Sequence, residues 1–226
     1  MLIELRNVNK EYANGKNVKA TPLINVDFRV DEGEKVVISG PSGIGKSTLL
    51  NIIGCIDNVT SGEYLFKGEY IENYSEKQKA EIRNRNIGYV LQNNGLISYR
   101  NVYDNVSVPL IYNKLVKKNE YRDKIEHALE SVGMSNYAKR NVDELSGGEK
   151  QRVAIARAIV NNPDIILADE PTGALDWKNK EKIMDLLFEM GEDGRTLIMV
   201  THDMEIAERF SHHYSFNTDG KINRIR

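Results

Sequence analysis

The chain has 226 residues and a net charge of −2 with acidic and basic side chains interspersed, so bulk electrostatics give no sign of nucleic-acid binding and no nucleic-acid partner is expected. The single cysteine excludes an internal disulfide. No segment approaches the roughly 20 apolar residues of a transmembrane helix and no signal peptide is recognised, so a chain in the cytoplasm is expected.

The first part of the chain predicts antiparallel strands. Residues 1 to about 35 alternate polar and apolar side chains, beginning with a strand over Leu2–Tyr12, and Tyr64–Phe66 belongs to the same group. Asn14-Gly15 and Glu32-Gly33 are typical of turns between such strands. We therefore expect an antiparallel β subdomain.

A phosphate loop follows the first buried strand. Val36–Ile38 is a short apolar run, and Ser47–Ile53 carries apolar residues at helical spacing. Between them the chain fits G-x-x-x-x-G-K-[ST]; the loop residues are Gly40, Pro41, Ser42, Gly43, Ile44, Gly45, Lys46, Ser47 and Thr48. In this pattern backbone N–H groups surround the β-phosphate, Lys46 neutralises the β- and γ-phosphates, and the Ser47 hydroxyl binds Mg²⁺. The dipole of the following helix favours the same anion. Cys55 is expected on this helix as a buried thiol.

Three further apolar runs each lead into polar residues suited to phosphate chemistry. They are Tyr89–Leu91 before Gln92, Ile165–Ala168 before Asp169 and Glu170, and Leu197–Val200 before Thr201 and His202. Short runs rich in β-branched residues are typical of buried parallel strands, and such sheets bind ligands beyond the carboxyl ends of their strands. The sequence therefore gathers a phosphate loop, a glutamine, two acids and a histidine at one edge, which indicates an ATPase.

The remaining segments are mainly helical. Ser75–Asn84 is charged and helical, and most of residues 93–160 follow a helical pattern, including Glu120–Val132, whereas Asn93–Val102 has no periodicity and is expected to be an exposed loop. Residues 161–210 return to strand and helix, and Tyr214–Arg226 is expected to form a hairpin. We expect one domain, residues 1–226, into which a helical subdomain of about residues 93–160 is inserted.

Leu145-Ser146-Gly147-Gly148-Glu149 is a second glycine-rich motif. A helix is predicted from Glu149 to Val160, so this motif offers free N–H groups and a hydroxyl at a helix N-terminus, which suits an anion. With this motif in place, the whole chain resembles the ATP-binding subunit of an ATP-binding-cassette (ABC) transporter. The resemblance implies a P-loop NTPase core with a parallel sheet, an antiparallel β subdomain and an α-helical subdomain.

The resemblance also implies a role for each motif. Ser146, Gly147 and Gly148 of one subunit would cap the ATP held by the phosphate loop of its partner in a homodimer. Asp169 would hold Mg²⁺ through water, with Ser47 and Gln92 as further metal contacts. Glu170 would be the general base, and His202, Lys46 and Gln92 would act with it on the γ-phosphate and the attacking water. Asp176 would reach across the dimer interface, and Tyr12 would stack on adenine.

Taken singly, these residues have plainer interpretations. Asp169-Glu170 could be a helix cap or a solvated pair, His202 a loop or buried histidine, and Tyr12 an ordinary strand tyrosine. The order and spacing of the whole set favour the ATPase interpretation. Gly173 stands where many members of the family have serine, and Glu149 where many have glutamine; both variants occur in the lipoprotein-releasing and macrolide-export branch.

Cassette ATPases also drive DNA repair and translation, so the class of function must still be decided. The stretch between Gln92 and Leu145 is too short for the coiled-coil arms of DNA-repair members, and the single phosphate loop argues against the two-cassette translation factors. A transporter subunit is favoured, with a subunit that transmits force to an extracellular hydrolase as the alternative and a soluble ATPase as the third possibility.

Among transporters, the chain resembles the branch that releases lipoproteins and exports macrolides or peptide bacteriocins. The resemblance rests on Thr60–Tyr64, Asn101–Val106 and Asp169–Asp176. It implies a membrane permease partner with an extracytoplasmic domain, and a location on the inner face of the cell membrane. In this family the loop after Gln92 helps to form the groove for a helix of the permease, so Leu96, Ile97 and Tyr99 are expected to be its apolar anchors.

Overall fold

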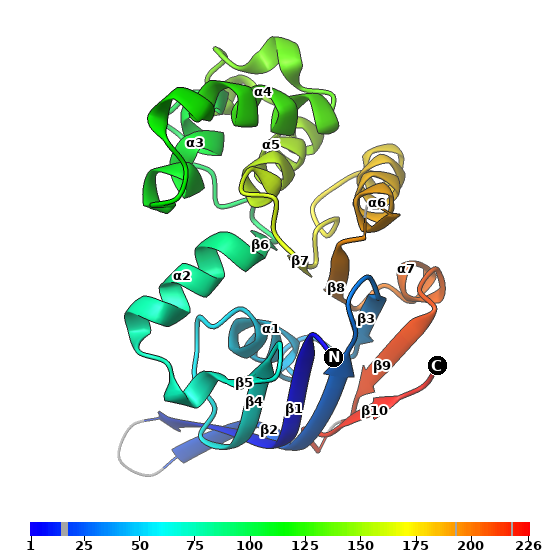
Figure 1. The fold of residues 1–226 in the computed structure, drawn as a ribbon. Helices are drawn as coiled ribbons and strands as arrows, with labels where there is room; N and C mark the ends of the chain where they lie inside the picture. Colours follow the sequence, from blue (N-terminus) through cyan, green and yellow to red (C-terminus); the bar gives the residue numbers. More distant parts are fainter. Residues whose placement is uncertain (15–17, 193, 218) are drawn as a thin grey trace. The chain divides into compact units, whose positions relative to one another are not determined.

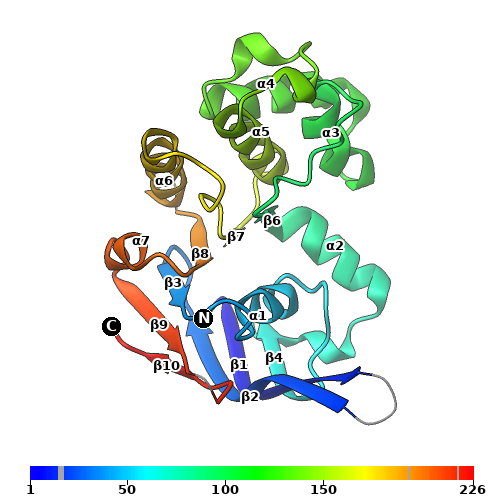
Figure 2. The same cartoon turned by 180° about the vertical axis from the view of Figure 1, so that it is seen from behind.

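The computed structural model describes residues 1–14, 18–192, 194–217 and 219–226, and Figures 1 and 2 show it from opposite sides. The chain divides into two compact units. The first comprises Met1–Arg83 and Thr196–Arg226, and the second comprises Asn84–Arg195. Among the described residues, no helix is long and apolar enough to cross a membrane.

An antiparallel sheet forms one part of the first unit. Its strands are β1 (Ile3–Asn14), β2 (Val18–Val30), β4 (Ser61–Phe66) and β5 (Glu69–Tyr70), in the order β2-β1-β4-β5. Ile3 and Leu5 alternate with polar neighbours and are fully buried, as expected for a half-buried sheet. The predicted antiparallel strands are confirmed, although Gly15 of the predicted Asn14-Gly15 turn lies outside the described residues.

Parallel strands form the other part of the first unit. Here β3 (Lys35–Ser39) lies between β8 (Thr196–Thr201) and β9 (His212–Phe216), parallel to both, and β10 (Ile222–Arg224) is antiparallel to β9. Every residue of β8 is buried, which is why its sequence is a continuous apolar run between two threonines. The predicted C-terminal hairpin is confirmed as β9 and β10.

Three helices and a 3₁₀ turn complete the first unit: α1 (Lys46–Ile53), η1 (Ile71–Asn73), α2 (Glu76–Asn86), whose last turn enters the second unit, and α7 (Met204–Glu208). Helix α1 contacts β2 and β8 and buries Leu49, Leu50 and Ile53. Cys55 is buried as expected, but its predicted place on α1 is wrong. The helix ends at Ile53 with Gly54 as its C-cap, and Cys55 has a φ of +53°, which is outside helical geometry.

The second unit is a helical body on two parallel strands, β6 (Ile87–Val90) and β7 (Ile165–Asp169). Its helices are α3 (Val102–Tyr112), α4 (Tyr121–Ser131), α5 (Gly147–Ile159) and α6 (Trp177–Glu192), with 3₁₀ turns η2 (Lys118–Glu120), η3 (Ser135–Tyr137) and η4 (Val142–Glu144). Helix α5 is central, because it contacts α3, α4, α6 and β6 (Figure 1). Two predicted boundaries are wrong: β6 ends before the exposed Leu91, and α5 begins at Gly147 instead of Glu149.

Candidate functional site

The phosphate loop depends on glycines that no other residue could replace without strain. Gly40, Gly43 and Gly45 have φ values of +152°, +78° and +123°, which favour glycine. A Cβ on Gly45 would lie 2.6 Å from the carbonyl oxygen of Pro22, and one on Gly40 would lie 3.0 Å from the Cβ of Phe216. The loop therefore packs closely against two strands of its unit while keeping the curved backbone that can surround a phosphate.

Lys46 begins α1 and lies against the loop that it follows. Its side chain is buried, and its ammonium group donates to the carbonyl oxygens of Gly40 at 2.7 Å and Pro41 at 2.9 Å. The first turn of α1 contains no acidic residue, so the positive end of the helix dipole is not neutralised there. Ser47 and Thr48 occupy the same turn, so the predicted lysine and metal-binding hydroxyl both come from the N-terminus of this helix.

Tyr12 lies on β1 in the same unit, with 39% of its surface exposed. Its hydroxyl donates to Asp57 at 2.5 Å, and the ammonium group of Lys10 lies 4.7 Å from the ring centroid. Burial, and after it the hydrogen bond with the Asp57 carboxylate, raises the pKa of the Tyr12 phenol. The ring predicted to stack on adenine is therefore held by a buried-lysine and aspartate pair that sequence reasoning missed.

His202 follows β8 directly, where the prediction placed it. Thr201 is buried, and its hydroxyl accepts a hydrogen bond from the backbone N–H of Asp203 at 3.0 Å. Asp203 in turn caps α7, accepting from the N–H groups of Glu205 and Ile206. The exposed His202 thus lies on a turn fixed at both sides.

In the second unit, Gln92 and Glu170 both follow the carboxyl edge of β6 and β7 and both lie near Gly173. The two strands pair in register up to Val90 and Ala168, so the residues beyond them emerge side by side. A Cβ on Gly173 would lie 3.5 Å from the amide nitrogen of Gln92 and 3.7 Å from a carboxylate oxygen of Glu170. Gly173, which the sequence showed only as a departure from serine, therefore borders both side chains.

Glu170 itself has an unusual backbone. Its φ is +43°, a region that non-glycine residues rarely adopt and that is enriched at functional sites. Its carbonyl oxygen accepts from the N–H of Gly173 at 3.1 Å, which closes the turn after β7. Asp169 is the last residue of β7. Burial, and after it the charge of Asp169, raises the pKa of Tyr89 on β6. Asp169 and Glu170, predicted to act on the metal and on the attacking water, thus lie at the start of a strained turn.

The Ser146 motif forms the N-terminus of α5, but its hydroxyl is not free as the sequence led us to expect. Ser146 and Glu149 form a capping box: the hydroxyl and N–H of Ser146 donate to the Glu149 carboxylate at 2.7 and 2.8 Å, and the N–H of Glu149 points back to the hydroxyl. These bonds lower the pKa of Glu149. The spacing S-x-x-E was the sequence signal for this arrangement.

Asp176 and the Ser146 motif are joined by Asn179. The Asp176 carboxylate caps α6, accepting from the N–H of Asn179 at 3.0 Å and from its side-chain amide at 2.7 Å. A Cβ on Gly148 would lie 2.9 Å from the Asn179 side-chain oxygen, and one on Gly147 would lie 3.5 Å from Leu175. The start of α5 therefore rests on the loop that carries Asp176, and Gly148 is glycine because Asn179 fills the space.

The segment after Gln92 is anchored at its base and exposed at its tip. Arg157 on α5 donates to the carbonyl oxygens of Asn94 and Gly95, both at 2.6 Å, and Asn105 bonds both backbone groups of Ile97. Leu96 and Ile97 are half-buried, whereas Tyr99 is 83% exposed. The predicted loop is confirmed, but only Tyr99 among the three expected anchors is fully exposed.

The donor set fits the expected ligands. The glycine cradle and the N-terminus of α1 suit a phosphate. In the first unit Ser47 offers a hydroxyl, and in the second unit Gln92 offers an amide oxygen and Asp169 a carboxylate, which are oxygen groups of the kind that Mg²⁺ prefers. The first unit supplies Tyr12, the phosphate loop and His202, while the second supplies Gln92, Asp169, Glu170, Asp176 and the Ser146 motif.

Comparison with known proteins identifies the family of the chain. The family model described as ABC transporter matches residues 23–173. The chain belongs to the ABC transporter family, as an ATP-binding subunit with the mixed α/β cassette fold. The Bacillus subtilis ABC transporter ATP-binding protein YknY is 49% identical over 207 residues, covering 92% of this chain and 89% of the relative.

Solved structures give the same answer. The ABC transporter cassette MJ0796 of Methanocaldococcus jannaschii, in a dimeric structure, has a TM-score of 0.89 and 40% identity, covering 100% of this chain and 99% of that one. A second dimeric structure of MJ0796, in a post-hydrolysis state bound to ADP and Pi, matches with the same values.

Proposed function

We propose that this chain hydrolyses MgATP in a homodimer and thereby powers a membrane transporter. The observation that carries this proposal is the placement of Glu170: a carboxylate on a left-handed turn at the end of β7, on the same side of Gly173 as the amide of Gln92. A strained acid near a polar amide is suited to hold and deprotonate a water molecule.

Both units contribute residues to the proposed reaction. In the first unit the phosphate loop and Lys46 bind the triphosphate, and Ser47 with Gln92 and Asp169 would hold Mg²⁺, which neutralises phosphate charge when bound. Lys46 would exchange its bonds to the Gly40 and Pro41 carbonyls for phosphate oxygens. His202 would hydrogen-bond the γ-phosphate, and Ser146 to Gly148 would cap the ATP of the second copy.

The transport assignment rests on family membership and on the branch resemblance of the chain. We infer a permease partner with an extracytoplasmic domain, a location on the inner face of the membrane, and a peptide, lipoprotein or antibiotic as the exported substrate. The dimeric structures of the related cassette support assembly of two copies.

The test is Glu170→Gln, which keeps the size of the side chain and removes the base. Phosphate release from ATP should fall by roughly 100-fold or more, while ATP binding is retained. Size-exclusion chromatography with ATP should show a stable dimer of this variant. Glu189→Gln, on the exposed surface of α6, is the matched control and should behave as the unmodified chain. Undiminished hydrolysis by Glu170→Gln would remove Glu170 as the base.

A further inference from the structure

Tyr12 forms a polar cluster with Lys10 and Asp57, two residues that lie outside the predicted nucleotide-binding motifs. The Asp57 carboxylate joins two groups: one oxygen accepts from the Tyr12 hydroxyl at 2.5 Å, and the other from the Lys10 ammonium group, also at 2.5 Å. The same ammonium group lies 4.7 Å from the centroid of the Tyr12 ring. The tyrosine is therefore held at its hydroxyl and covered on one face.

The lysine of this cluster is buried and has several partners. Lys10 is 8% exposed and donates a second bond, at 2.8 Å, to the carbonyl oxygen of Asn58. Burial of Asp57 alone would raise its pKa, but bonds from Lys10, Tyr12 and the N–H of Asn58 outweigh it and keep the pKa below its ordinary value. A charged pair with this many partners favours one geometry, because loss of its bonds would leave the buried Lys10 ammonium group unsatisfied.

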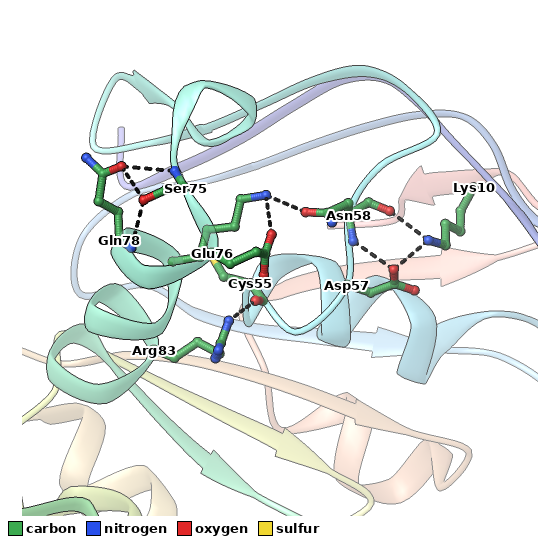
Figure 3. Close-up of polar contacts among 9 residues, drawn as sticks. Lys10, Cys55, Asp57, Asn58, Ser75, Glu76, Gln78 and Arg83 are labelled. Atoms are coloured by element: carbon green, nitrogen blue, oxygen red, sulfur yellow. Dashed lines mark hydrogen bonds and ion pairs between the residues drawn. The ribbon is translucent and has the colours of Figure 1, made fainter. Parts of the chain in front are cut away.

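The loop that carries Asp57 is itself fixed from two sides (Figure 3). Lys79 of α2, which is 6% exposed, donates to the side-chain oxygen of Asn58 at 2.5 Å and to Glu76, and Arg83 donates to the carbonyl oxygen of Cys55. In the other direction, the N–H of Asp57 donates to the carbonyl oxygen of Asn51 on α1 at 3.1 Å. Asp57 is thus joined directly to the helix that begins with the phosphate-loop lysine.

We propose that Asp57, oriented by Lys10, is a positioning residue that sets the Tyr12 ring to receive the base of the nucleotide at a fixed place relative to the phosphate loop. This rests on the proposed function, because it assumes that the loop binds ATP. Lys10 covers one face of the ring, and the ring surface that remains exposed accepts the adenine. Because the ring is already ordered, stacking costs less side-chain entropy than it would on a free tyrosine.

The test compares three variants by steady-state ATP hydrolysis. Tyr12→Ala removes the stacking surface and should raise KM for ATP roughly 10- to 100-fold, the range for loss of one stacked base. Tyr12→Phe keeps the ring and loses the hydrogen bonds of the hydroxyl with Asp57 and Thr48. Asp57→Asn keeps the shape of the side chain and loses the charge, and it leaves the bond to Thr48 in place. Both should raise KM by roughly 3- to 10-fold, the range for ordering one side chain, with kcat at saturating ATP preserved.

Inorganic tripolyphosphate separates positioning of the base from damage to the site. It carries the charge of the triphosphate without a base, so its inhibition constant should stay the same in all three variants. Tyr70→Phe is the matched control, since Tyr70 lies on β5, is also 39% exposed and lies outside the cluster, and its KM should not change. Thermal unfolding identifies any variant that is simply misfolded; Tyr12→Phe leaves the Lys10–Asp57 ion pair in place and keeps the test decisive.

The outcomes separate this proposal from the proposed function. If the unmodified chain hydrolyses ATP but Tyr12→Phe and Asp57→Asn have its KM, the positioning role is overturned and the ATPase assignment stands. A parallel loss of tripolyphosphate binding would also overturn it, since the cluster would then support the whole site. If the unmodified chain does not hydrolyse ATP, the proposed function itself fails.

Discussion

The carboxylate of Glu149 accepts hydrogen bonds from both the hydroxyl and the backbone N–H of Ser146, at 2.7 and 2.8 Å. These are among the groups that the proposed function assigns to the ATP of the second subunit. A carboxylate already bonded to them competes with phosphate and adds a negative charge beside it. In the single chain the hydroxyl and N–H of Ser146 are therefore already hydrogen-bonded, and under the proposed function the ATP of the second subunit would have to displace that contact.

Glu149→Gln should strengthen ATP-dependent dimerisation. The amide keeps a weaker acceptor but carries no charge, so the dimer observed by size exclusion should form at roughly 3- to 10-fold lower ATP concentration, as expected for one partly exposed charge at close range. Glu144→Gln, an exposed acid in η4 just before the motif, is the control. Equal ATP requirements for Glu149→Gln and the unmodified chain would show that the capping contact does not compete.

The same contact predicts a pH dependence of stability. The bonds from Ser146 lower the pKa of Glu149 below its ordinary value of 4.5, so their contribution is fully present above that value and is lost as the pH falls through the lowered pKa. The melting temperature of the unmodified chain should exceed that of Glu149→Gln at pH 7, and the difference should close below about pH 4. A difference that is constant across this range would contradict the assignment.

Two glycines of the phosphate loop allow a matched stability experiment. Gly43→Ala and Gly45→Ala both place a side chain at positive φ, but a Cβ at position 43 has no atom within 4 Å, whereas one at 45 lies 2.6 Å from the Pro22 carbonyl oxygen. Gly43→Ala should cost about 1 kcal/mol for its backbone conformation. Gly45→Ala should cost about 1–3 kcal/mol more, because β2 or the loop must shift. Urea unfolding measures the loss of unfolding free energy in both variants. Equal losses would mean that the loop shifts to accommodate the Cβ at position 45 without a further loss of stability.

The elements that could be predicted from the sequence are those whose signal comes from residues close together in the chain. The strands around Val36–Ile38 and Ile165–Ala168 were found because their signal is local: a continuous apolar run. The start of α5 was misplaced because Gly147 and Gly148 are weak helix formers, yet the Ser146 cap and the contact with Asn179 hold them in the helix.

The motifs of the candidate site were predicted from the sequence, but the residues that hold those motifs in place were not. Lys10 and Asp57 are 47 positions apart in the chain, and no periodicity or spacing connects them. Asn179 likewise has no motif, although it joins Asp176 to Gly148. Contacts of this kind arise from tertiary packing, which a single sequence does not encode in a local pattern.

The composite site predicts that two inactive variants restore each other. Lys46→Ala should weaken nucleotide binding, since it removes a charge from the phosphates, and Ser146→Arg should block the motif that caps the second subunit's ATP. Each variant alone should hydrolyse ATP poorly. In a mixed dimer one phosphate loop and one signature remain intact and face each other, so an equal mixture should recover up to about a quarter of normal activity. A mixture no more active than its components would argue against a site shared between two copies.

The last prediction concerns the loop after Gln92, where hydrolysis would be coupled to the permease. Arg157 and Asn105 fix the base of this loop, while the 83% exposed Tyr99 has little contact with its own chain. An exposed aromatic ring on a fixed loop is suited to contact a permease helix that binds in a groove beside the loop. Leu96 is half-buried, so we expect it to lie at the bottom of that groove. Tyr99→Ala and Leu96→Asp should therefore leave the basal ATPase of the purified subunit near normal and abolish its assembly with, or stimulation by, the proposed permease. Tyr70→Ala, an exposed tyrosine on β5, is the control and should assemble normally. If both loop variants were captured and stimulated like the unmodified chain, the permease would have to bind another surface.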